Sequence, residues 1–227
     1  MKTIAIIQPS FIPWRGYFSF FNQCDVFVFY DDVQYDKHGW RNRNQIKTHS
    51  GLQWVSVPVL TKGHSTQKIL EAKIDYTINW QDKVLKSIRN AYIKAPHFEN
   101  YFPCVQAIIS KKWDTISNLD IALTTEIAQL FEIKCSFHKS SDIDIPQDFS
   151  KVRRLIHICQ HFGANQYLSG PSAKDYIDAE NLFPNFKIEL KYISYDFPIY
   201  EQLHGEFQSS VSILDLLFNC GPDKKLI

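Results

Sequence analysis

Several features that would commit a chain to a specialised class of protein are scarce in this sequence of 227 residues. Its 25 Lys and Arg balance 24 Asp and Glu, so the basic excess of a general nucleic-acid binder is missing. Eight Gly and ten Pro leave little room for a low-complexity linker. No apolar run approaches the ~20 residues that span a bilayer. We therefore expect a folded protein without nucleic-acid binding or membrane insertion.

Cysteine pairs and a secretory signal are also missing. The five cysteines are odd in number and form no CxxC pair, which favours packed thiols in a reducing compartment over disulfides or zinc. The apolar start of the chain is interrupted by Gln8 and Pro9, well before the ~7–15 apolar residues of a signal peptide. We expect the protein to be located in the cytoplasm. We expect no bound metal ion, and Mg²⁺ is the one cation that the motifs could bind.

Aromatic residues are what the sequence has in excess, with 17 Phe, 11 Tyr and 5 Trp. The chain length suits a single domain of residues 1–227. Strand-like and helix-like patterns alternate along it, which predicts an α/β fold with a mostly parallel sheet flanked by helices. A helical block at 78–131 is a candidate subdomain. Expected strands are 3–7, 25–30, 52–60, 68–76, 134–138, 166–168 and 187–192. Expected helices are 17–22, 79–92, 101–112, 117–131, 149–162 and 212–220, and 34–47 is an expected loop or exposed ribbon.

The first chemical motif, QPSFIPWRGYF at 8–18, follows the first strand. Its prolines stiffen the loop, while Gln8, Arg15 and Tyr17 supply polar groups where a helix begins, a position suited to an anion or a nucleotide. The alternative is that Trp14 and its aromatic neighbours only cover the sheet. Gln8 is the stronger candidate, because an amide at the end of a buried strand requires a partner.

Two acids and one histidine are the candidate proton acceptors. Asp31 and Asp32 end the second strand, where a carboxylate can hold Mg²⁺, orient a ribose or act as a general base; forming a turn is the alternative. His64 lies in the turn KGHSTQ and is a candidate acid–base group. His157 and His161 are four residues apart without the Glu of an HExxH motif, so packing or surface roles are favoured.

Two further motifs suit a phosphorylated ligand. The motif GWRNRNQIK at 39–47 alternates Arg and Asn beside Trp40. Its arginines are suited to a diphosphate, and its asparagine amides to hydrogen bonds with a sugar or a base. A solvated basic hairpin is the alternative. YLSGPSAKDYID at 167–178 contains a turn at Ser169 and Gly170 whose backbone can bind phosphate, with Lys174 and Tyr176 as further contacts. A tight turn capped by Ser172 is the alternative.

These motifs together resemble the WbqC-like family. The resemblance rests on Q-P-x-[FY]-x-P-W-x-G-Y, then Y-D-D-V-Q-[YF], then W-R-N-R-N-x-I-K, and extends through YLSGPSAKDYID, PIYEQLHGEF and SILDLLFNCGP over nearly the whole chain. It implies a role in bacterial O-antigen and surface-polysaccharide biosynthesis, with a nucleotide-linked amino sugar and an activated acyl donor as partners. It also implies a site surface formed by Gln8, Trp14, Gly16, Tyr17, Asp31, Asp32, Trp40, Arg41, Asn42, Arg43, Asn44 and Lys47.

Three functions remain open at this point. The favoured one is acyl or aminoacyl transfer to a nucleotide-linked amino sugar. The second is nucleotidyl transfer or carboxylate activation with ATP and Mg²⁺, because the first loop is similar in position to the HxGH loop of nucleotidylyltransferases and class I synthetases. Trp14 and Tyr17 stand where that signature has His, so only the fold and the nucleotide-facing loop carry over. The third is a non-catalytic ligand-binding module of a glycan-assembly complex. The sequence leaves a homo-oligomer open.

Overall fold

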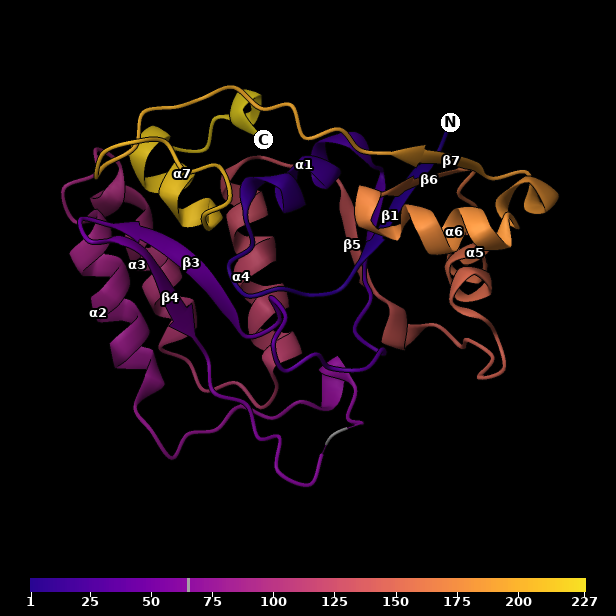
Figure 1. Cartoon of the computed structure of the whole chain (residues 1–227), viewed down its shortest axis with the longest axis horizontal. Helices are drawn as coiled ribbons and strands as arrows, with labels where there is room; N and C mark the ends of the chain where they lie inside the picture. Colours follow the sequence, from indigo (N-terminus) through magenta and orange to yellow (C-terminus); the bar gives the residue numbers. More distant parts are fainter. Residues whose placement is uncertain (65) are drawn as a thin grey trace.

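A computed structural model describes residues 1–64 and 66–227 of the chain. Its centre is a five-stranded parallel sheet (Figure 1). The strands lie in the order β5-β2-β1-β6-β7, with bounds β1 Thr3–Ile7, β2 Val26–Phe29, β5 Ser136–Lys139, β6 Gln166–Ser169 and β7 Glu189–Tyr192. Counting only these five strands in chain order, the arrangement is 3-2-1-4-5. The parallel sheet and its flanking helices confirm the α/β fold predicted from the sequence.

Alternating side chains of the central strands face two separate cores. Ile4 and Ile6 of β1 belong to a core under α5 (Lys151–His161) and α6 (Lys174–Glu180), whereas Ala5 belongs to a larger core under α1 (Arg15–Gln23) and α4 (Ile116–Leu130). This two-sided burial explains why TIAII lacks polar alternation, as predicted for a strand covered on both faces. The helices have the bounds α1 Arg15–Gln23, α2 Trp80–Tyr92, α3 Phe98–Ile109, α4 Ile116–Leu130, α5 Lys151–His161, α6 Lys174–Glu180 and α7 Ile213–Cys220.

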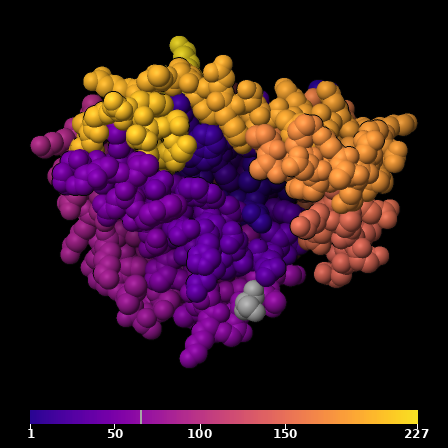
Figure 2. Space-filling view, viewed as in Figure 1, coloured from indigo at the N-terminus to yellow at the C-terminus, as the bar shows by residue number. Residues whose placement is uncertain are grey.

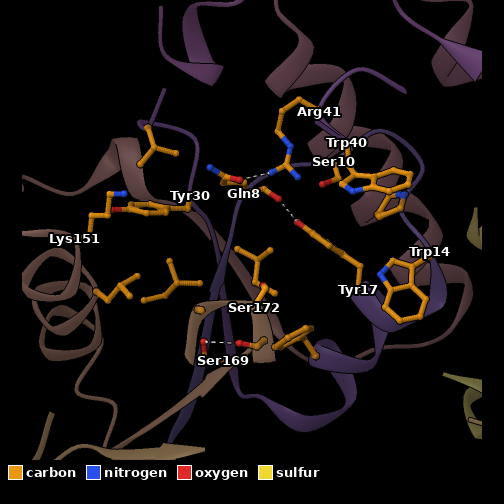
Figure 3. Close-up of a pocket in the computed structure, with 18 of the residues that line it drawn as sticks. Gln8, Ser10, Trp14, Tyr17, Tyr30, Trp40, Arg41, Lys151, Ser169 and Ser172 are labelled. Carbon is orange, nitrogen blue, oxygen red and sulfur yellow. Dashed lines mark hydrogen bonds between the residues drawn. The ribbon is translucent and has the colours of Figure 1, made fainter. Parts of the chain in front are cut away.

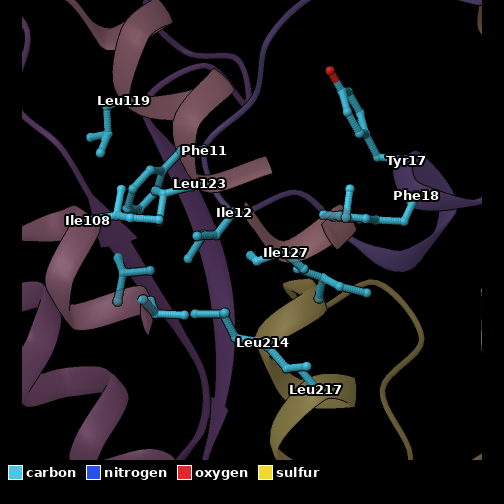
Figure 4. Close-up of a cluster of buried hydrophobic side chains, with 14 of the residues drawn as sticks. Phe11, Ile12, Tyr17, Phe18, Ile108, Leu119, Leu123, Ile127, Leu214 and Leu217 are labelled. Atoms are coloured by element: carbon cyan, nitrogen blue, oxygen red, sulfur yellow. The ribbon is translucent and has the colours of Figure 1, made fainter. Parts of the chain in front are cut away.

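The larger core joins distant parts of the chain. Phe11 and Ile12 of the first loop pack among leucines of α4 and α7, including Leu123 and Leu214 (Figure 4). Helices begin close to their predicted positions where a side chain caps the first turn. The capping side chains each accept a hydrogen bond from a backbone N–H; they are Asn79 for α2, Thr115 for α4, Ser150 for α5 and Ser212 for α7.

Two local predictions are wrong. Residues 34–47, expected as a loop or exposed ribbon, end in β3 (Arg43–Thr48), which pairs antiparallel with β4 (Gly51–Ser56); alternate side chains Asn44 and Ile46 point inward. The strand expected at 68–76 contains a 3₁₀ turn, Ile69–Glu71, because the Glu71 carboxylate accepts from the Lys68 backbone N–H at 2.8 Å and closes the turn. Residue 65 of the expected turn at 62–67 lies outside the described residues.

Candidate functional site

A cavity of about 760 Å³ opens at the carboxyl ends of the central strands. Its walls include Gln8 after β1, Tyr30 after β2, and Ser169 with Gly170 at the end of β6. β1 lies between β2 and β6, so the chain leaves β1 toward one side of the sheet and later returns on the other. Open α/β sheets bind ligands at such a switch point. The space-filling view shows the hollow, with the indigo N-terminal segment at its base (Figure 2).

Gln8 is held at the base of this cavity from two sides. Its side-chain Oε1 accepts a hydrogen bond from Nη1 of Arg41 at 2.7 Å, and its backbone oxygen accepts from the Tyr17 hydroxyl at 3.0 Å (Figure 3). Burial raises the pKa of Tyr17 well above its usual value. Tyr17 therefore remains a neutral hydrogen-bond donor at physiological pH.

Asn44 fixes the loop that follows Gln8. Its side-chain Nδ2 donates to the backbone oxygens of Phe11 at 3.1 Å and Ile12 at 3.0 Å, while its Oδ1 accepts from the Gln45 N–H at 2.8 Å. Ile12 has a φ of 37°, in the left-handed region that a β-branched residue rarely adopts. The amide of Asn44 thus stabilises a strained loop conformation and connects the loop to β3.

Three cationic side chains line the cavity: Arg41, Lys151 and Arg154. No Asp, Glu or His is among the described residues that line it. Arg154 donates from Nε to the Tyr30 hydroxyl at 2.9 Å and forms an ion pair with Asp32, so its guanidinium is held in place. Lys151 and Arg154 come from the first turn of α5, whose helix dipole adds further positive potential. The cavity is suited to an anionic ligand.

Aromatic rings line the opposite side of the cavity. Figure 3 shows Trp14 and Trp40 across from Lys151 and Tyr30. The Trp14 ring lies 5.0 Å from that of Tyr195, and Trp40, 47% exposed, lies 5.4 Å from Trp54. These rings offer flat apolar faces to a base or a sugar beside the cationic groups.

Gly16 allows this placement of Trp14. A Cβ atom at Gly16 would lie 2.2 Å from the Trp14 ring, closer than any real contact. The W-x-G spacing of the sequence therefore reflects a direct contact between the glycine backbone and the indole that lines the cavity.

The predicted proton acceptors lie away from the lining. Asp31 is buried and accepts from the Ser141 backbone N–H at 3.0 Å and its hydroxyl at 2.9 Å; burial raises the pKa of Asp31 against these bonds. Asp32 pairs with Arg154 and accepts from the Ser140 hydroxyl at 2.5 Å. His64 is exposed in a separate, shallower pocket. In this structure the two acids position neighbouring groups.

Eight of the predicted binding residues line the cavity, and four do not. Those that line it are Gln8, Trp14, Tyr17, Trp40, Arg41, Asn44, Ser169 and Gly170. Arg15 points to the C-terminal segment, where it donates to the Pro198 backbone oxygen at 2.7 Å and lies over the ring of Phe197.

The other three are used within the fold. Asn42 donates to the Val57 backbone oxygen at 2.7 Å, and Arg43 lies over the ring of Trp54. Lys47 is buried and its Nζ donates to Gln202 at 3.1 Å. Arg41 and Asn42 precede β3 (Arg43–Thr48) in a turn, so the strand periodicity does not determine which side chains of this motif reach the cavity.

Sequence reasoning missed Lys151 and Arg154. Their signal was visible in SKVRR, where basic residues fill the first turn of a helix capped by Ser150. Basic residues are unfavourable at a helix N-terminus, which marks this turn as unusual; Arg154 is balanced there by its ion pair with Asp32. Of the two further predicted contacts, Tyr176 lines the cavity, and Lys174 instead pairs with Asp178. Ser172, named as the cap in the alternative interpretation, lines the cavity and caps neither the 3₁₀ turn Pro171–Ala173 nor α6.

The described residues show neither a candidate metal site nor a helix that could span a membrane. They contain no group of three or more His, Cys, Asp or Glu arranged to hold a metal ion. In the same residues, every helix is too short or too polar to cross a bilayer.

Comparison with known proteins identifies one family. The model of the WbqC-like protein family matches residues 8–227. Uncharacterized protein Rv1507c of Mycobacterium tuberculosis (strain ATCC 25618 / H37Rv) is 41% identical over 225 residues, which cover 98% of this chain and 96% of that protein. No solved structure matches the chain.

Proposed function

Because the chain belongs to the WbqC-like protein family, we propose that it is a transferase of bacterial surface-polysaccharide biosynthesis. The proposed reaction is acyl or aminoacyl transfer to a nucleotide-linked amino sugar. In it, the amine nitrogen forms a bond to the acyl carbon, the bond from that carbon to its leaving group breaks, and the amine proton passes to the leaving group or solvent. The association of the resembled family with O-antigen loci supports the pathway.

The observation that carries this proposal is the cavity at the switch point, whose described lining residues include three cationic side chains and no carboxylate. Lys151 can donate to a diphosphate oxygen, and Arg41 and Arg154 can donate with the N–H groups that they do not use on Gln8, Tyr30 and Asp32. Trp14 and Trp40 offer faces to the base and the sugar. The volume of about 760 Å³ is within the range of small-molecule sites.

Carboxylate activation with ATP and Mg²⁺ is the second candidate, and one observation favours it. Since no carboxylate or imidazole is among the described lining residues, a reaction that needs no protein base suits the cavity. A substrate carboxylate is already ionised at neutral pH; its oxygen would bond to the α-phosphorus while pyrophosphate leaves. The strand order is also that of nucleotide-binding α/β sheets.

Binding tests the shared premise of both candidates. UDP, dTDP and ATP with Mg²⁺ are added to the protein, and the melting temperature and Kd are measured. Lys151→Gln is expected to weaken nucleotide binding about fivefold, corresponding to about 1 kcal/mol for one exposed charged contact. Arg153→Gln is the matched control, because Arg153 is exposed on the same helical turn but does not line the cavity. If no nucleotide binds, both candidates fail.

Product analysis separates the candidates. Incubation with nucleotide-linked amino sugars and activated acyl donors should give an N-acylated nucleotide sugar by mass spectrometry. Pyrophosphate release from ATP that depends on an added carboxylate would favour the second candidate. Nucleotide binding without turnover across a broad substrate panel would contradict both reactions and favour a binding module.

A further inference from the structure

Two cysteines from distant parts of the chain lie against each other at one edge of the central sheet. The Sγ atoms of Cys24 and Cys135 are 3.7 Å apart, although 111 positions separate the two residues in the sequence. All five cysteines are free, and the other three contact no further cysteine in the part of the chain that the structure describes. The contact between Cys24 and Cys135 is therefore a specific feature of this fold, and the cavity does not explain it.

The backbone of the sheet brings the two thiols together. Cys24 ends α1 and leads into β2, and Cys135 directly precedes β5. Val26 of β2 and Ser136 of β5 are partners in the parallel ladder, and the Ser136 N–H donates to the Asp25 backbone oxygen at 3.0 Å. Neighbouring strands lie about 4.8 Å apart and rise about 3.3 Å per residue, which puts the two cysteine Cα atoms about 6 Å apart. A disulfide spans about 4.4–6.8 Å between Cα atoms, so a bond can form without displacing either strand.

The thiol pair lies at the opposite end of the strands from the cavity. β5 is an edge strand of four residues that is joined to the sheet through β2. At its carboxyl end, the Ser140 hydroxyl donates to Asp32, which is the ion-pair partner of Arg154 in the cavity wall. Elements with few contacts open locally more easily than the centre of a sheet. A bond between the thiols would therefore fasten the edge strand that supports this wall, without entering the cavity.

The two sulfurs differ in accessibility. Cys135 is partly exposed, whereas Cys24 is buried. The hydrogen bond with Cys135 is the largest cause that raises the pKa of the Cys24 thiol, and burial is the second. Cys24 therefore keeps its proton, and Cys135 is the sulfur that a small molecule in solvent can reach. When the Cys135 sulfur is bonded to another group, it can no longer hold the Cys24 proton as a thiolate acceptor, and the largest obstacle to ionisation of Cys24 is removed.

We propose that Cys24 and Cys135 form a reversible intramolecular disulfide, with a low-molecular-weight disulfide such as oxidised glutathione as the oxidant. The Cys135 thiolate attacks one sulfur of oxidised glutathione, whose S–S bond breaks and releases one glutathione thiolate. Cys24 loses its proton to solvent and attacks the Cys135 Sγ, which displaces the second glutathione thiolate. The two thiolates take up the two protons that the cysteines lost, so two protein thiols are oxidised while one oxidised glutathione is reduced to two thiols. The bond stabilises the fold mainly by restricting the unfolded chain, and it does not depend on the proposed function.

Oxidation of the wild-type protein in glutathione buffers tests this proposal directly. The reduced protein is equilibrated at several ratios of oxidised to reduced glutathione, quenched with acid, alkylated, and mapped as unreduced peptides by mass spectrometry. We expect the peptides that contain Cys24 and Cys135 to be joined, and the loss of two thiols to lower the count of free thiols from five to three. The melting temperature should rise by about 5–15 °C on oxidation and return to its original value with dithiothreitol.

Cys135→Ser and Cys104→Ser are the matched variants. Both cysteines are partly buried, but the Cys104 thiol donates to the Tyr101 backbone oxygen at 2.9 Å and contacts no cysteine in the described residues. The rise in melting temperature on oxidation should disappear in Cys135→Ser and persist in Cys104→Ser. If Cys135→Ser does not fold, the peptide map of the wild type still decides. A pair that stays reduced in oxidised glutathione alone, a disulfide between other cysteines, glutathione retained on Cys135 without closure, or a Cys24–Cys135 bond that leaves the melting temperature unchanged would each overturn the proposal.

Discussion

Replacing Asn44 with alanine removes the amide that holds the first loop against β3. Asn44 is 2% exposed, and its Nδ2 donates to the Phe11 and Ile12 backbone oxygens at 3.1 and 3.0 Å. Each buried carbonyl left without a donor costs about 1–3 kcal/mol, and partial rearrangement reduces the sum to about 2–4 kcal/mol. For a chain of this size each kcal/mol lowers the melting temperature by roughly 2–4 °C. We expect a decrease of about 5–15 °C.

The assay is urea unfolding of Asn44→Ala beside Asn42→Ala. Asn42 belongs to the same motif but donates a single hydrogen bond, at 2.7 Å, to the Val57 backbone oxygen, so its removal should cost about 1 kcal/mol. Equal slopes of the free energy of unfolding against urea concentration would show that both variants expose the same amount of surface on unfolding. The reasoning is refuted if Asn44→Ala costs less than 1 kcal/mol or no more than Asn42→Ala.

Three further changes have defined outcomes. Gly16→Ala should weaken UDP binding several-fold and lower stability by about 1–2 kcal/mol, because the added methyl group displaces the Trp14 ring; unchanged Kd and melting temperature would contradict this. Thr124→Val should leave stability unchanged or raise it, since the buried Thr124 hydroxyl has no hydrogen-bond partner in the part of the chain that the structure describes; a loss above 1 kcal/mol in urea unfolding would contradict this. Burial raises the pKa of Asp120, so the folded state binds a proton at this residue more tightly than the unfolded state does. The free energy of unfolding should therefore decrease as pH rises above about 4, and it should decrease less steeply in Asp120→Asn. Parallel pH profiles of the two proteins would contradict this.

The fold was predictable from the sequence where local signals agree with burial. The strand TIAII and the helix capped by Ser150 are each determined by a few adjacent residues, and the structure confirms both. The strand expected at 68–76 was wrong because its apolar residues enter the core from irregular backbone: Ile69 and Ile74 are buried without belonging to a regular strand. Tertiary packing, which no local pattern records, decides such segments.

The site was predictable only where its residues follow a strand. Gln8 and Ser169 were found because strand ends indicate the edge of a sheet. Arg15 was assigned to the site by its motif, yet its side chain leaves the first turn of α1 toward Pro198, and only the path of the distant C-terminal segment determines this. The contact between Cys24 and Cys135 had no local signal either, since only the pairing of β2 with β5 brings the two thiols together.

The strand order also determines when the site can exist during synthesis. β1 pairs with β6 through Ile4 and Tyr167, so one wall of the cavity is translated long before the other. At typical rates of protein synthesis, about 5–20 residues per second, the interval is roughly 10–30 s. Throughout this interval, the backbone N–H and C=O groups along the edge of β1 that will pair with β6 have no partner strand. A nascent chain is therefore exposed to mispairing in this interval, and the cavity is complete only when both halves of the sheet have come together.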